Sequence, residues 1–72
     1  MTNQEIRNDL AQALLAASVA LGLLGTGLEN KVEPAALSDT EKAMMHLALA
    51  QTHKLAQALA ALGGHIRGGT KR

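Results

Sequence analysis

The chain of 72 residues contains no phenylalanine, tyrosine, tryptophan or cysteine. Without cysteine it forms neither disulfides nor thiolate metal sites. Aromatic rings commonly hold bases, nucleotides and quaternary amines, so the lack of aromatic residues excludes binding by stacking. The formal net charge is only +1, so no strong electrostatic field draws the chain toward nucleic acid or anionic lipid.

What the chain does contain is alanine and leucine, concentrated in two stretches of similar length. The first stretch predicts a helix from about Asn3 to Leu24, with Thr2 or Asn3 as N-cap. At about 100° per residue, one side of this helix is continuously apolar. From Leu10 to Leu28 the apolar steps alternate between four and three residues, which is typical of a coiled-coil core. The predicted core face consists of Ile6, Leu10, Ala13, Leu14, Ala17, Leu21, Leu24 and Leu28.

A second apolar row lies on another side of the same helix. Leu15, Val19 and Leu23 follow one another at intervals of four residues, and Gly22 is small enough to let another helix approach closely. Two helices cannot cover both apolar sides of the first one. We therefore expect this row to be an oligomer interface in a homodimeric four-helix bundle.

The second helix has the clearest predicted start. Ser38 and Glu41 have the spacing of a capping box, and the apolar pattern continues to about Leu62, before a pair of glycines. Its apolar face consists of Met44, Met45, Ala48, Thr52, Leu55, Leu59 and Leu62. Glycines after Leu24 predict a linker over 26–37. The predicted organisation is a helical hairpin domain over 1–64 and a flexible basic tail over 65–72.

The opposite side of the second helix offers the candidate partner-binding residues. His46 and His53 lie seven residues apart, roughly 10 Å along a helix, which is too far for a shared metal ion. No nucleophile has a base beside it, so we expect no enzyme activity, no cofactor and no metal site. The candidate recognition residues are Lys42, His46, His53, Gln57, Arg67, Lys71 and Arg72.

The stretch Leu10–Leu28 lacks charge and approaches the length of a membrane span. Its glycines, its polar residues and its balanced flanking charges weigh against that interpretation. A small membrane protein therefore remains an alternative, and a cytoplasmic location is favoured. A nucleic-acid-binding regulator that uses the polar residues and the basic tail is a second alternative.

The predicted layout resembles that of the Rop family of plasmid RNA-binding regulators, in which two hairpins pair as a four-helix bundle. The near-neutral charge, the longer linker and the absence of phenylalanine depart from that family, so no residue role is carried over. Because the first helix has a second apolar row that needs a cover, we expect an all-α, non-enzymatic regulator that binds and inhibits a partner protein. Such small chains are common among phage- and plasmid-encoded inhibitors.

Overall fold

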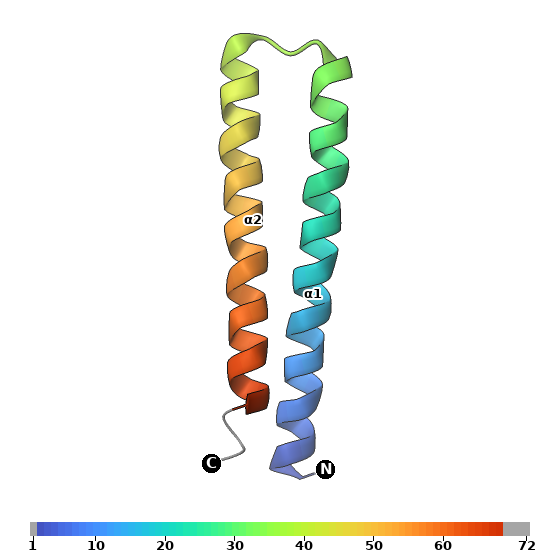
Figure 1. Cartoon of the computed structure of the whole chain (residues 1–72), viewed down its shortest axis with the longest axis vertical. Coiled ribbons are helices and arrows are strands. Elements are labelled where there is room, and N and C mark those ends of the chain that lie inside the picture. Colours follow the sequence, from blue (N-terminus) through green and yellow to red (C-terminus); the bar gives the residue numbers. More distant parts are fainter. Residues whose placement is uncertain (1, 69–72) are drawn as a thin grey trace.

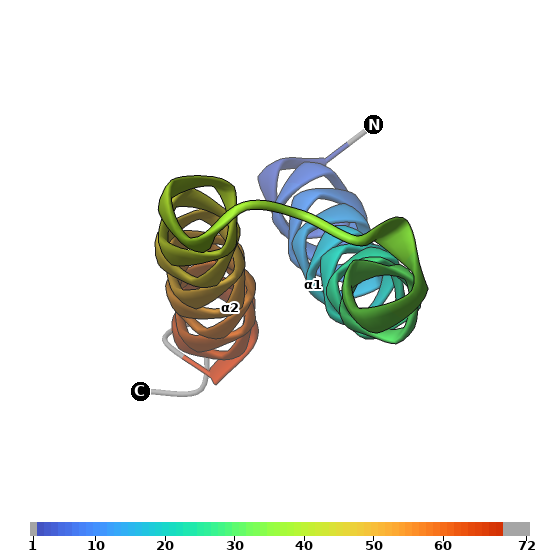
Figure 2. The ribbon, with the colours of Figure 1, turned by 90° about the horizontal axis from the view of Figure 1, so that it is seen from above.

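The computed structural model describes residues 2–68, which form two long antiparallel helices and a short connection. Helix α1 covers Asn3–Val32, the 3-10 turn η1 covers Glu33–Ala35, and α2 covers Asp39–Gly68. The two helices lie side by side along an axis of 52 Å (Figure 1). Seen along that axis, the molecule is one layer that is two helices wide (Figure 2). The predicted all-α hairpin is therefore confirmed.

Both helices begin with a capping box. Thr2 accepts a hydrogen bond from the Glu5 backbone N–H, while the Glu5 carboxylate accepts from the Thr2 backbone. The predicted box at Ser38 is confirmed: the Glu41 N–H donates to Ser38 Oγ over 3.2 Å, and the Ser38 N–H donates to Glu41 Oε1 over 2.9 Å. The hydrogen bond from the Ser38 backbone and, to a smaller extent, the one from its side chain lower the pKa of Glu41.

The predicted end of the first helix is wrong. α1 continues through Gly25, Thr26 and Gly27 to Val32, so most of the predicted linker over 26–37 is helical. Gly25 lies beside α2, where a Cβ would make an ordinary contact with Thr52 Cγ2 at 3.8 Å. Thr26 donates its hydroxyl hydrogen to the Gly22 carbonyl within the helix. Glycine lowers helix propensity by about 1 kcal/mol, and packing against a second helix overrides that cost.

The second helix also extends beyond its predicted end at Leu62. It runs to Gly68, so residues 65–68 of the predicted flexible tail belong to α2. Arg7 Nη2 donates a hydrogen bond to the Ile66 carbonyl over 3.2 Å, which satisfies one acceptor near the end of α2. Residues 69–72 of the predicted tail lie outside the described residues.

The connection between the helices is short because η1 directly continues α1. Pro34 stands at the start of η1, where its missing N–H is harmless. Ala36 then adopts a left-handed conformation with φ of 54°, which turns the chain toward α2. An alanine in this conformation is strained by about 1–2 kcal/mol.

The seam between the helices consists largely of small residues. Ala11 is fully buried, and the other buried residues within 2–68 are Ala56 and Gly63. Ser18 donates its hydroxyl hydrogen to the Ala56 carbonyl over 2.6 Å across the seam. No large side chain among the described residues is fully buried. The hairpin is thus held by close backbone approach and not by a core of leucines.

The predicted core faces are therefore wrong in part. On the first helix, only Leu14 and Leu21 of the predicted set are half-buried, and the other members are exposed. On the second, Met45, Thr52 and Leu59 are half-buried, and the other members are exposed. The physical reason is that small side chains let two helices approach most closely, so Ala11 and Gly63 take the seam and the leucines move to its flank.

Two neighbouring glycines in α2 test this seam. A Cβ on Gly63 would lie 3.0 Å from Leu15 Cγ and 3.1 Å from the Ala11 carbonyl oxygen, whereas one on Gly64 meets nothing within 4 Å. We expect Gly64→Ala to raise the free energy of unfolding by about 0.5–1 kcal/mol through helix propensity. Gly63→Ala should lower the free energy of unfolding, although it brings the same gain in helix propensity. Urea denaturation followed by circular dichroism measures both, and equal effects would contradict the seam.

The cap of α2 predicts a dependence of stability on pH. Because the pKa of Glu41 is lowered in the folded state, its stabilising contribution is present above the ordinary glutamate pKa and is lost as the pH falls through the folded-state value. Glu41→Gln removes the negative charge that the Ser38 hydrogen bonds stabilise, and it should destabilise the protein near neutral pH. Its deficit should shrink in acid. A deficit that stays constant from neutral pH into acid would show that the cap does not act through Glu41.

Candidate interaction surfaces

The seam divides the hairpin into two broad sides, and the sequence places different chemistry on each. On α1, Ala11, Ser18 and Gly25 recur every seven residues; on α2, Leu49, Ala56 and Gly63 do the same. Because the helices are antiparallel, the same offset from a seam residue falls on the same side of the pair. Residues that come one position before a seam residue, or three positions after it, therefore all lie on one side of the hairpin.

This first side, the apolar face, is aliphatic apart from Thr52. From α1 it has Leu10, Leu14, Ala17, Leu21, Leu24 and Leu28, and from α2 it has Ala48, Thr52, Leu55, Leu59, Leu62 and Ile66. Leu24 is 62% exposed and Leu55 is 52% exposed, although both belong to faces that the sequence predicts as core. No other element of residues 2–68 covers them, since the molecule is a single layer (Figure 2). A leucine row on both helices is therefore left open to solvent.

The predicted oligomer row does not form part of this face. Leu15 is half-buried in the hairpin itself, where it packs beside Gly63. Val19 and Leu23 are 63% and 70% exposed, and a Cβ on Gly22 would meet nothing within 4 Å. The role of this row in assembly stays a prediction.

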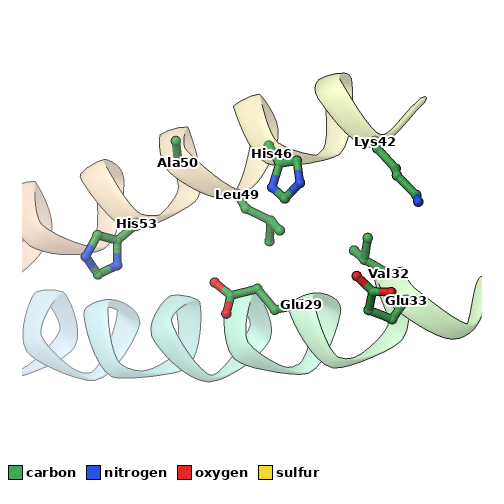
Figure 3. Close-up of a pocket in the computed structure, with 8 residues that line it drawn as sticks. All are labelled: Glu29, Val32, Glu33, Lys42, His46, Leu49, Ala50 and His53. Carbon is green, nitrogen blue, oxygen red and sulfur yellow. The ribbon is translucent and has the colours of Figure 1, made fainter. Parts of the chain in front are cut away.

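The other side of the seam, the polar face, contains an open groove near the connection. It has a volume of about 540 Å³ and lies between the end of α1 and the first half of α2 (Figure 3). Val32, Leu49 and Ala50 supply its apolar surface. Its α1 wall bears Glu29 and Glu33, and its α2 wall bears Lys42, His46 and His53.

The groove brings together three of the predicted recognition residues. Lys42 and His46 extend from α2 toward α1, while the Glu29 carboxylate is directed back toward α2 (Figure 3). His53 lines the same groove, and Gln57 Nε2 lies 3.4 Å from His53 Nε2, within hydrogen-bonding distance. Among residues 2–68, no ion pair joins Glu29 or Glu33 to the opposite wall.

Arg67 is separated from this cluster. It lies at the opposite end of the hairpin, where it lines a smaller hollow with Gln4, Asn8 and Gln12. Lys71 and Arg72, the last two predicted recognition residues, lie outside the described residues. The structure therefore assembles Lys42, His46 and His53 but does not bring Arg67 to them.

Glu29 and Glu33 are the groove residues that sequence reasoning missed. They were assigned to a linker because glycines precede them, and a linker gives no fixed side-chain direction. Their spacing of four residues is the signal that could have found them, since it places both carboxylates on one side of a helix. Two carboxylates that face a lysine over an apolar floor can bind a ligand that carries both signs of charge.

Within the described chain, the continuous helical stretch Asn3–Ala35, which joins α1 and η1, is long and apolar enough to cross a membrane. Only 6% of its most apolar stretch is buried inside the hairpin. No protein-family model matches the chain, and no curated protein or solved structure is significantly similar to it.

Proposed function

We propose that this chain is a non-enzymatic interaction protein, which assembles as a homodimeric four-helix bundle and inhibits a partner protein that it binds. The observation that supports this proposal is the apolar face, which the hairpin leaves uncovered. Two hairpins that stack apolar face to apolar face form four helices around a shared leucine core. The polar face of each hairpin then remains available to the partner.

The surface area supports the second copy. The chain exposes 5452 Å², whereas a compact monomer of 7.5 kDa exposes about 4,250 Å². The excess is about 1,200 Å² per chain, and a stable interface removes about 800 Å² or more from each partner. The radius of gyration of 16.4 Å also exceeds the roughly 11 Å of a compact domain of this length. One further hairpin can therefore cover the excess.

The position of Lys54 disfavours a bilayer as the cover. The Ser18–Ala56 hydrogen bond and the contact of Gly25 with Thr52 place Lys54 beside the middle of the Leu10–Leu28 stretch. If that stretch crossed a membrane with α2 packed along it, Lys54 would enter the centre of the bilayer. A lysine there costs about 2.5–3.5 kcal/mol even on translocon-insertion scales.

The charges of the polar face favour a protein partner over nucleic acid. Phosphate binding needs several cations with no opposing charge. Glu29 and Glu33 stand across the groove from Lys42 and His46, so they would repel a phosphate bound there. An alternation of both signs suits a protein surface that also carries both.

A pair of neighbouring leucines tests the assembly. Leu24 belongs to the apolar face, whereas Leu23 points away from the seam and belongs to the predicted row of Leu15 and Val19. We expect Leu24→Asp to weaken the dimer by roughly 100-fold, because it places an unpaired charge in the interface. Leu23→Asp should leave the dimer intact. Light scattering with refractive-index detection measures the mass of each.

Three results would count against this assembly. A monomeric, helical wild-type chain would overturn the shared core. Dissociation by Leu23→Asp but not by Leu24→Asp would move the interface to the predicted row. Flotation of the wild-type chain with zwitterionic phosphatidylcholine vesicles would show that lipid, and not a second copy, covers the apolar face.

A further inference from the structure

The groove on the polar face has walls of opposite charge, which narrows the kind of partner that fits it. We infer that it binds an amphipathic helix of the partner protein, with an apolar stripe flanked by acidic residues on one edge and basic residues on the other. The inference rests on the proposed function and names the partner segment. The surface involved lies on the opposite side of the seam from the apolar face.

The dimensions of the groove suit a helix. Its α2 wall runs from Lys42 to His53, eleven residues or about 17 Å, which is about three helical turns. Val32 and Leu49 are half-buried and lie in its floor, leaving apolar surface at the bottom. A helix that lies in a groove makes such contacts through side chains at i, i+3, i+4 and i+7.

The charges fix the edges of that helix. Glu29 near the end of α1 and Glu33 at the start of η1 lie one turn apart and are exposed. On α2, Lys42 supplies the positive charge of the facing wall, and the imidazoles of His46 and His53 are exposed beside it. Since no ion pair links these walls within the described residues, their charges are available to a ligand. A partner edge with lysine or arginine complements the α1 wall, and an edge with aspartate or glutamate complements the α2 wall. A helix with one sign of charge is repelled by one wall.

Gly22 lies on this same side of α1 and supports close approach by a third helix. Gly63 is accounted for by the seam, where a Cβ would lie 3.0 Å from Leu15 Cγ, whereas a Cβ on Gly25 would make an ordinary contact with Thr52. A Cβ on Gly22 meets nothing within 4 Å, so nothing inside the hairpin requires glycine there. An uncovered glycine in a helix lets an approaching backbone come nearer than any other residue does.

The experiment uses a synthetic alanine-based helical peptide with a leucine stripe, one tryptophan, a glutamate edge and a lysine edge. Two matched peptides carry glutamate on both edges or lysine on both edges. The chain contains no aromatic residue, so tryptophan emission reports on the peptide alone. We expect the mixed-edge peptide to bind the full-length dimer about tenfold more tightly than either single-sign peptide.

Two single charge reversals locate the site. Glu29→Lys makes the α1 wall cationic at one position, so it should weaken the mixed-edge peptide about tenfold and strengthen the glutamate-edged one. Asp9→Lys changes the net charge by the same amount as Glu29→Lys but lies outside the groove. It should change the affinity of neither peptide. Circular dichroism and light scattering on both variants verify that the folded dimer persists.

Equal binding of all three peptides, or equal loss in both variants, would overturn the inference, because either result indicates nonspecific electrostatics. No binding by a chain that light scattering shows to be dimeric would also overturn it while leaving the proposed assembly standing. A monomeric chain that still binds the mixed-edge peptide at Glu29 would support the inference and overturn the proposed assembly.

Discussion

The close approach of the two helices at a seam of small residues determines the rest of the molecule. Ala11 and Ser18 on α1 face Ala56 and Gly63 on α2, and the hydroxyl of Ser18 reaches the facing backbone directly. Small side chains bring helix axes together but bury little apolar area. The leucines are therefore displaced to one flank, where the hairpin cannot cover them. The proposed second copy would cover this displaced row of leucines.

The same seam gives the molecule two unlike sides. The apolar face on one flank has leucines from both helices, and the polar face on the other has carboxylates, imidazoles and a lysine around an open groove. In the proposed dimer, the apolar faces meet at the centre and the two grooves point outward in opposite directions. One assembly then has two equivalent sites for the partner, which is an arrangement that increases avidity when the partner is itself repeated.

The sequence predicts much of the fold and three of the eight residues that line the groove. The two helices, their antiparallel packing and the Ser38 capping box follow from local periodicity and hydrogen bonding, which sequence reasoning reads well. The predicted core faces contain most of the leucines that lie together on the apolar face. The sequence pattern places these leucines between the two helices of the hairpin, whereas the structure leaves them on one flank of the seam. Hydrophobic periodicity selects large residues, whereas the seam between two helices selected small ones. Glycines also predicted helix ends where packing keeps the chain helical, and this error hid Glu29 and Glu33.

In the proposed assembly, folding and association are one process, because the seam of alanine and glycine buries little apolar area within one chain. The most direct test is the thermal midpoint of the wild-type chain, followed by circular dichroism over about a 100-fold range of protein concentration. The account predicts a midpoint that rises steadily with concentration, since dimerisation stabilises only the folded state. A midpoint that does not change with concentration would show that a single hairpin is stable alone, and it would contradict the account.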